Sequence, residues 1–170
     1  MKKLYPIVLV FTAVLLLVAA CGGGGADDLL AEIEERGTIR VSTDANYAPQ
    51  SYLDESGNFV GFDIDVATEI AERLGVEVEF VTPDWDVITA GNSGGQWDMS
   101  VGSMTVTTDR QQVLDFADPA YYYTPAQFAA ADGSGIDSLD DINGQSVCVG
   151  LSTTYETWLS GDKASLGLPD

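Results

Sequence analysis

The chain has 170 residues, 45% of them apolar, which is enough to bury a core in one ordinary domain or two small lobes. Its charge is one-sided: 27 acidic residues stand against 7 basic ones, the sequence contains no histidine, and the formal net charge is −20. Such a surface repels phosphate backbones and anionic headgroups, which argues against nucleic acid as a partner and against docking on lipid through basic patches.

The N-terminal residues 1–21 have the pattern of a lipoprotein signal peptide. Two lysines precede an almost unbroken apolar run at residues 4–18. As a helix this run would span about 22 Å, less than the ~30 Å hydrocarbon core, so it favours a secretory signal over a membrane-spanning helix. Residues 18–21 read Val-Ala-Ala-Cys and resemble a bacterial lipobox. We therefore expect Cys21 to carry a lipid; an ordinary signal cleaved nearby is the alternative.

Residues 22–36 are predicted to form a tether and a short helix. The tether is the glycine run at 22–25, and the helix covers residues 27–35, which begin with acidic residues and end before Gly37. If Cys21 is acylated, Cys148 is the single remaining thiol, which excludes an internal disulfide. Its apolar neighbours predict a small buried side chain.

Strands and helices are then predicted in alternation. The β-branched residues 38–43 predict a strand, and residues 46–50 a loop. Segments 51–53 and 58–61 flank turn-forming residues and predict a hairpin. Apolar residues at helical spacing predict a helix over 63–74.

The following segment continues this alternation. Residues 76–82 predict a strand, residues 85–90 a short helix, and residues 97–102 another strand. Thr107 is placed to cap a helix over 108–114.

The last part of the chain has the same character after a break. Residues 121–131 are apolar and strand-like, and the glycine-containing residues 132–135 interrupt them. A short helix is predicted at 138–142, a strand at 146–150 and a helix at 154–160. The whole pattern predicts an α/β fold with a lobe boundary near residue 132.

The short motifs, taken in order, resemble family 3 of the periplasmic solute-binding proteins of ABC transporters, the polar amino-acid group. The resemblance extends from residue 27 to about residue 160. The matching motifs are GTIRV at 37–41, TDANYAP at 43–49, GFDID at 61–65, WD at 85–86 and 97–98, GSMTVTTDR at 102–110, DFADP at 115–119, YYY at 121–123 and STTYE at 152–156.

The resemblance implies a periplasmic-binding-protein-like fold, in which two α/β lobes joined by a hinge enclose a ligand. Residues 37–131 correspond to lobe 1, and residues 132–170 to the start of lobe 2. Family members continue well beyond the position of Ser160, so the second lobe is expected to be incomplete. Gln50 and Ser51 stand where the family commonly has an aromatic residue and a carboxylate. Some members use that carboxylate to bind basic side chains, so its absence argues against lysine or arginine as the ligand.

The resemblance also implies a function. The chain is expected to be a monomeric, lipid-anchored, extracytoplasmic component of an ABC importer, located in the cell envelope, without cofactor or metal. It would bind an amino acid or similar small zwitterion and deliver it to the permease subunits. A cyclohexadienyl-dehydratase-like enzyme or a ligand-sensing domain on the same fold are the alternatives. The lack of histidine and of a nucleophile motif argues against an enzyme.

The family match assigns a set of ligand-binding residues. Arg110 matches the arginine that binds the ligand carboxylate, for which a planar fork of N–H donors is suited. The alternative role for Arg110 is a surface ion pair with Asp109 or Asp115. For the aromatic residues the alternative is core packing, and for the serine and threonine residues it is helix capping. Asp63 and Asp65 lie where a strand turns into a helix, and capping and packing are expected of them rather than acid–base chemistry. The implied ligand-binding residues are Tyr47, Trp85, Ser103, Thr105, Arg110, Thr153 and Thr154.

Overall fold

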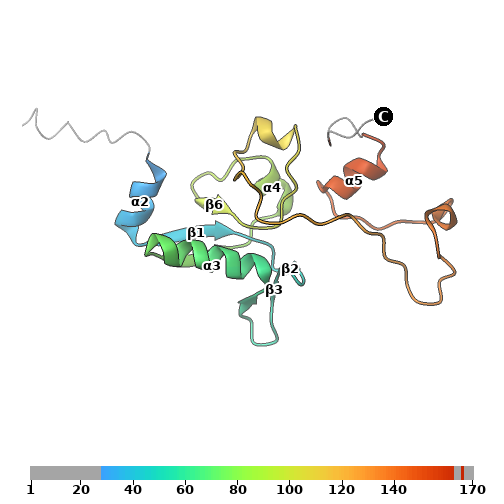
Figure 1. Ribbon diagram of the computed structural model, residues 1–170, viewed down its shortest axis with the longest axis horizontal. Helices are drawn as coiled ribbons and strands as arrows, with labels where there is room; N and C mark the ends of the chain where they lie inside the picture. Colours follow the sequence, from blue (N-terminus) through green and yellow to red (C-terminus); the bar gives the residue numbers. More distant parts are fainter. Residues whose placement is uncertain (1–27, 163–165, 167–170) are drawn as a thin grey trace, which may run out of the picture. The chain divides into compact units, whose positions relative to one another are not determined.

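The computed structural model describes residues 28–162 and residue 166 (Figure 1). The chain divides into two compact units, Met1–Arg36 and Gly37–Asp170. In the first, helix α2 (Leu29–Arg36) forms where a short helix was predicted, and it ends before Gly37, whose φ is 72°. The predicted signal peptide, Cys21 and the glycine tether lie outside the described residues. Within the described ranges no helix is long and apolar enough to cross a membrane.

The centre of the second unit is a parallel sheet of three strands. They are β1 (Thr38–Ser42), β5 (Glu77–Val81) and β6 (Met99–Ser100), in the order β5-β1-β6. Val41 of the middle strand pairs with Phe80 on one side and Met99 on the other and is fully buried. The predicted strands are confirmed. The third is shorter than expected, with two residues in the ladder.

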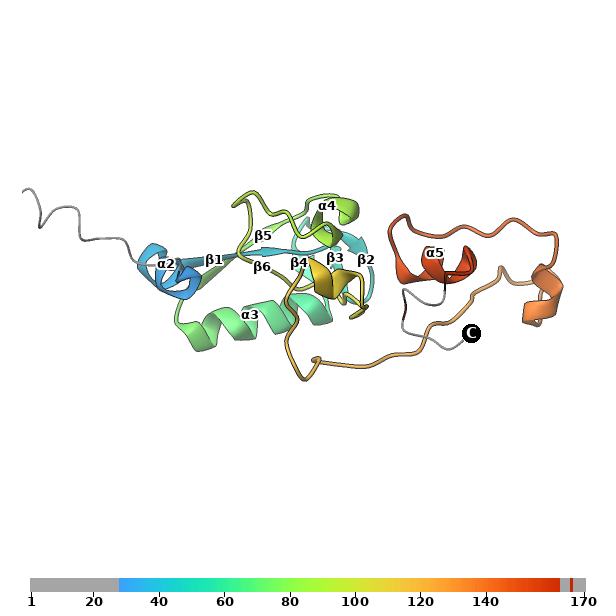
Figure 2. The same ribbon diagram turned by 90° about the horizontal axis from the view of Figure 1, so that it is seen from above.

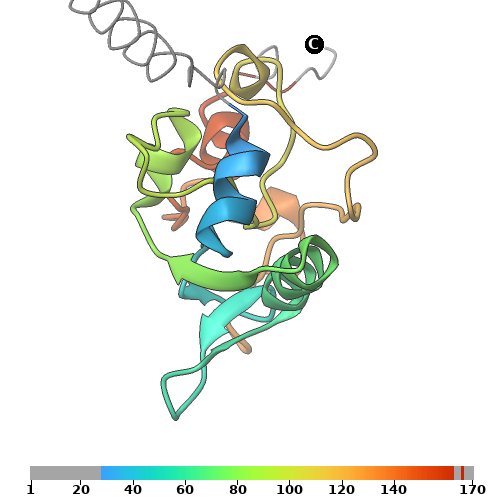
Figure 3. The same cartoon turned by 90° about the vertical axis from the view of Figure 1, so that its left-hand side faces the viewer.

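A small antiparallel sheet follows β1. Its strands are β2 (Asn46–Tyr47), β3 (Ser51–Leu53) and β4 (Phe59–Val60). The predicted hairpin is confirmed, and its turn is closed by the Asp54 carboxylate, which accepts from the backbone N–H groups of Ser56 and Asn58, both at 2.8 Å. The turn projects away from the parallel sheet (Figure 3). The segment predicted as a loop at 46–50 contains β2, because Asn46 and Tyr47 pair with β3.

Helix α3 (Phe62–Leu74) packs on the parallel sheet (Figure 2). Its buried face carries Ile64, Ala67 and Ala71 at helical spacing, and Gly75 ends it in the left-handed conformation, as predicted. The capping part of the prediction for Asp63 and Asp65 is wrong, because the cap position is Gly61 and no side chain bonds there. The burial of Asp63 agrees with the packing part.

The remaining elements are short. They are α4 (Trp85–Thr89), the 3-10 turns η1 (Arg110–Gln112) and η2 (Leu139–Ile142), and α5 (Thr154–Leu159). The helix predicted over 108–114 is reduced to η1. The strands predicted over 121–131 and 146–150 are wrong, because a strand needs a neighbour for its backbone groups and no described strand pairs with either segment (Figure 1).

The buried apolar core of the second unit belongs to residues 39–101. Its members are Ile39, Val41, Ile64, Ala67, Ala71, Ile88, Trp97 and Val101. Later apolar side chains are largely exposed, and the prediction that Cys148 is buried is wrong, since this free cysteine is exposed. The lobe boundary near residue 132 stays a prediction.

Candidate ligand-binding site

The carboxyl ends of the three parallel strands position the candidate site. Tyr47 follows β1, Trp85 follows β5, and Ser103 follows β6. Parallel strands have their carboxyl ends at one edge of the sheet, so residues that follow different strands meet there. This edge is the usual ligand position of open α/β sheets.

A cavity of about 650 Å³ lies at this edge. All seven residues implied by the family match line it, including Thr153 and Thr154, which come from the N-terminus of α5. The remaining lining residues are Asp44, Asp84, Asp86, Gly102, Tyr122, Thr124, Ala126, Gly150, Leu151 and Tyr155. The sequence thus identified a set of side chains that the fold brings together.

Arg110 is the single basic side chain among the lining residues, and it is only 9% exposed. Its Nη1 donates to the carbonyl oxygen of Thr105 at 2.9 Å, and its Nη2 to that of Ser152 at 2.9 Å. Burial lowers the pKa of Arg110, and the guanidinium nevertheless stays charged at neutral pH, as arginine does. The alternative of an exposed surface residue is wrong.

Packing on Trp85 orients the guanidinium together with these two hydrogen bonds. Its carbon lies 5.5 Å from the centre of the Trp85 ring, within the range of a cation–π contact. The three-residue turn η1, which begins at Arg110, is too short to add a helix dipole to the charge of the guanidinium. Each outer nitrogen of the guanidinium has a second N–H, so donors remain for a ligand carboxylate.

Ser152 links Trp85 and Arg110. Its carbonyl oxygen accepts from Trp85 Nε1 at 3.1 Å as well as from the guanidinium. The residue has a φ of 58°, uncommon outside glycine, and its N–H donates to Glu156 Oε2 at 2.6 Å. One backbone oxygen is therefore shared by two side-chain donors of the cavity.

Ser103 is held by two residues to which the family match assigned no ligand-binding role. Its hydroxyl donates to both carboxylate oxygens of Asp63 at 2.8 Å, and its N–H donates to the Tyr121 hydroxyl at 2.8 Å. Tyr121 in turn donates to Asp63 Oδ1 at 2.9 Å. Burial raises the pKa of Asp63, although the bonds from Ser103 and Tyr121 favour its charged form.

The other hydroxyl and phenol groups divide between capping and lining. Thr153 is the N-cap of α5: its Oγ1 accepts from the Glu156 N–H at 3.2 Å and donates to the Gly150 oxygen at 2.7 Å. Capping, the alternative role for this residue, is therefore present together with lining of the cavity. Burial, followed by the neighbouring Tyr155, raises the pKa of Tyr47 to about 12, so this phenol is neutral at physiological pH.

The charges that line the cavity are mainly negative. Asp44, Asp84 and Asp86 provide three carboxylates against one guanidinium. Among the described residues no group of three or more histidine, cysteine or carboxylate side chains could hold a metal ion. The arrangement suits a small molecule with one carboxylate and at least one cationic group.

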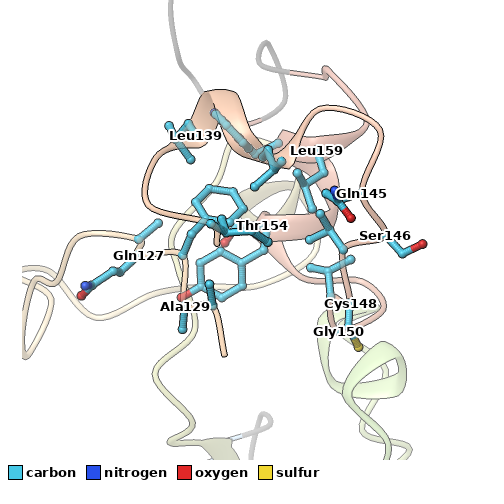
Figure 4. A pocket seen from close by; sticks show the side chains of 18 of the residues that line it. Gln127, Ala129, Leu139, Gln145, Ser146, Cys148, Gly150, Thr154 and Leu159 are labelled. Atoms are coloured by element: carbon cyan, nitrogen blue, oxygen red, sulfur yellow. The ribbon is translucent and has the colours of Figure 1, made fainter. Parts of the chain in front are cut away.

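A larger cavity, of about 1250 Å³, adjoins this one, with Thr105 and Thr154 lining both (Figure 4). Around it lie Leu139, Leu159 and Cys148, and the Phe128 and Trp158 rings lie 5.6 Å apart at its wall. Its walls are mostly apolar and include no arginine or lysine. It lacks the polar pairing that a charged zwitterion needs.

Comparison with known proteins connects this geometry to a family. Residues 39–164 match the family described as bacterial extracellular solute-binding proteins, family 3. The chain is 33% identical over 135 residues to the L-cystine-binding protein TcyJ of Escherichia coli, covering 78% of this chain and 50% of that protein. It is 35% identical over 132 residues to the lysine/arginine/ornithine-binding periplasmic protein of Escherichia coli, covering 77% and 50%.

A solved structure agrees with these matches. The ancestral amino acid-binding protein AncCDT-1, described as a precursor of cyclohexadienyl dehydratase, is 40% identical and superposes with a TM-score of 0.66 over 81% of this chain and 61% of that one. The predicted α/β, periplasmic-binding-protein-like fold is thereby confirmed. The chain spans about half the length of the curated relatives that it matches.

Proposed function

The chain belongs to family 3 of the bacterial extracellular solute-binding proteins, and on that premise we propose that it binds an amino acid in the Arg110 cavity for uptake by an ABC importer. The observation that carries this proposal is the buried guanidinium, packed on an indole at the carboxyl edge of the sheet. A buried arginine of this kind provides the bidentate donors that an α-carboxylate requires.

The proposal also includes the sign of the charge on the ligand side chain. The three lining carboxylates favour a ligand whose remaining groups are cationic, and the rings of Tyr47 and Trp85 offer apolar or cation–π contact to its side chain. One relative is named for binding lysine, arginine and ornithine, and another for binding L-cystine. Although Gln50 and Ser51 stand where the family commonly has an aromatic residue and a carboxylate, we infer from the three lining carboxylates that basic amino acids bind more tightly than acidic ones.

The wider setting is part of the same proposal. The lipobox-like sequence before Cys21 supports a lipid anchor in the cell envelope, and the ligand-bound form, with Thr153 and Thr154 closed over the ligand, would dock as a monomer on the permease subunits. The family is one of binding proteins, and a binding role without turnover is what the cavity supports best.

Arg110→Ala tests the proposal. In calorimetric titration with L-arginine, L-lysine, L-cystine and L-glutamate, we expect the basic ligands to bind best and the substitution to weaken their binding about tenfold or more, equivalent to about 1.4 kcal/mol. The physical reason is the loss of the charge-assisted bonds to the carboxylate.

Arg73→Ala is the matched control, because it removes an arginine whose side chain is 77% exposed on α3 and pairs with Glu69. It should leave the affinity unchanged. Equal affinities of the wild type and the Arg110 variant would contradict the assigned role of Arg110, and conversion of prephenate by the chain would favour the enzyme instead.

A further inference from the structure

A buried carboxylate outside the cavity lining is bonded to a residue that lines the cavity. Asp63, in the first turn of α3, is 0% exposed and does not itself line the cavity. Its two oxygens accept the Ser103 hydroxyl and its Oδ1 also accepts the Tyr121 hydroxyl. With the bond from the Ser103 N–H to the Tyr121 oxygen, the three residues form a closed ring of hydrogen bonds.

This ring surrounds a residue with an unusual backbone. Ser103 has a φ of 52°, in the left-handed region that residues with a Cβ seldom occupy, so such a conformation persists only where its surroundings hold it. Both the side chain and the N–H of Ser103 are engaged by the ring. Asp63 and Tyr121 therefore provide the restraints that the conformation requires.

The conformation of Ser103 sets the path of the chain through the site. Gly102, Ser103 and Thr105 line the cavity, and the Thr105 carbonyl accepts from Arg110 Nη1. A change at Ser103 would therefore move the segment that faces the ligand and also the oxygen that orients the guanidinium.

We propose that Asp63 is a positioning residue of the ligand site, which holds Ser103 in its left-handed conformation and through it aims the 102–105 segment at the ligand. The anchor of the carboxylate is rigid, because the Asp63 N–H donates to the Gln50 oxygen at 2.8 Å at the start of α3. An amide replaces the carboxylate only in part, since its oxygen can accept at the Oδ1 position but its NH₂ group cannot accept the Ser103 hydroxyl at the Oδ2 position. This inference rests on the proposed function for its ligand, and on geometry alone for the restraint of Ser103.

The first test uses Asp63→Asn with Asp65→Asn as the matched control. Asp65 lies in the same turn of α3 but is exposed, so its substitution removes the same charge from the helix without touching the ring. With L-arginine as the probe, we expect about a tenfold loss of affinity for the Asp63 variant and less than about twofold for the control. Equal affinities of the two variants would overturn the proposal.

A double-mutant cycle separates positioning from a general role in stability. Glycine adopts a φ near 52° without strain, so in the Ser103→Gly background the loss caused by Asp63→Asn should fall to less than about twofold. A general loss of core stability would instead reduce affinity by the same factor in both backgrounds, and that additive result would overturn the proposal.

A measurement without ligand distinguishes failure of this inference from failure of the proposed function. Tyr121→Phe keeps the aromatic side chain but removes the oxygen that accepts from the Ser103 N–H. Exchange of that amide hydrogen should therefore accelerate about tenfold or more. This variant also serves if Asp63→Asn does not fold. Unchanged exchange would overturn the restraint itself, whereas accelerated exchange in a chain that does not bind L-arginine would support the restraint and contradict the proposed ligand.

Discussion

The phenol of Tyr47 is kept neutral by its surroundings. Burial is the largest cause, and the neighbouring Tyr155 adds to it, so that the pKa of Tyr47 rises from 10.0 to about 12. An acid with a raised pKa holds its proton more tightly in the folded state than in the unfolded state. Its contribution to stability is therefore complete below the unfolded value of 10.0 and is lost as the pH rises to about 12.

Tyr47→Phe should accordingly lose less stability in alkali than the wild type does. We measure the loss of unfolding free energy between about pH 9 and about pH 12 by urea denaturation and expect it to be smaller by about 1 kcal/mol in the variant than in the wild type. This value is below the full effect of the pKa shift because the ring is partly exposed. Tyr123→Phe, at a position 84% exposed, is the control and should behave as the wild type. An equal loss of unfolding free energy in alkali for all three proteins would contradict the buried environment assigned to Tyr47.

Much of the site at residue level could be predicted from the sequence. The seven residues that the family resemblance implies line one cavity, and Tyr47, Trp85 and Ser103 among them follow the three parallel strands. The role of Asp63 could not be predicted in this way. Its bond to Ser103 joins residues 40 positions apart, and its position at the start of a helix is equally typical of a cap.

At the scale of elements, the junction between β4 and α3 depends on Gly61. Its φ is 127°, and a Cβ there would lie 2.3 Å from the backbone oxygen of Gln50. Neither the conformation nor the contact accommodates a side chain, because the atoms that an added Cβ would meet belong to the backbone of Gln50 and Pro49 and cannot rotate away.

Gly61→Ala should therefore destabilise the fold by about 3 kcal/mol. Gly57→Ala in the hairpin turn is the matched control, since its φ of 83° is also left-handed but no atom lies within 4 Å of an added Cβ. We expect a loss of about 1 kcal/mol there. Both values can be measured by urea unfolding at neutral pH, and similar losses at the two sites would show that the contact with Gln50 is unimportant.

The elements that were predicted correctly are those determined by local pattern. Helix α3 has an apolar stripe and a terminal glycine, and β1 has alternating β-branched residues, so each is recognisable without its neighbours. Residues 121–131 and 146–150 have the composition of strands, but pairing depends on a partner strand, which sequence pattern alone does not supply.

At the scale of the whole molecule, the net charge of −20 opposes folding through self-repulsion. Screening should relieve this, since the Debye length falls from about 30 Å at 0.01 M salt to about 10 Å at 0.1 M. We expect the thermal midpoint to rise by several degrees between these concentrations, equally in sodium chloride and choline chloride. A rise confined to sodium would indicate a specific ion site, and no rise would show that the acidic residues are already well separated.

The carbonyl oxygen shared by Trp85 and Arg110 gives the protein an intrinsic optical reporter. The sequence has three tryptophans, and the other two are placed differently: Trp97 lies in the core, and the Trp158 ring contacts the Phe128 ring at a tilt of 57°. We expect a molecule that draws the guanidinium toward itself to alter the hydrogen bond of this one indole N–H and hence its emission wavelength. Occupancy of the cavity can then be followed by fluorescence in dilute solution, without a dye or a tag.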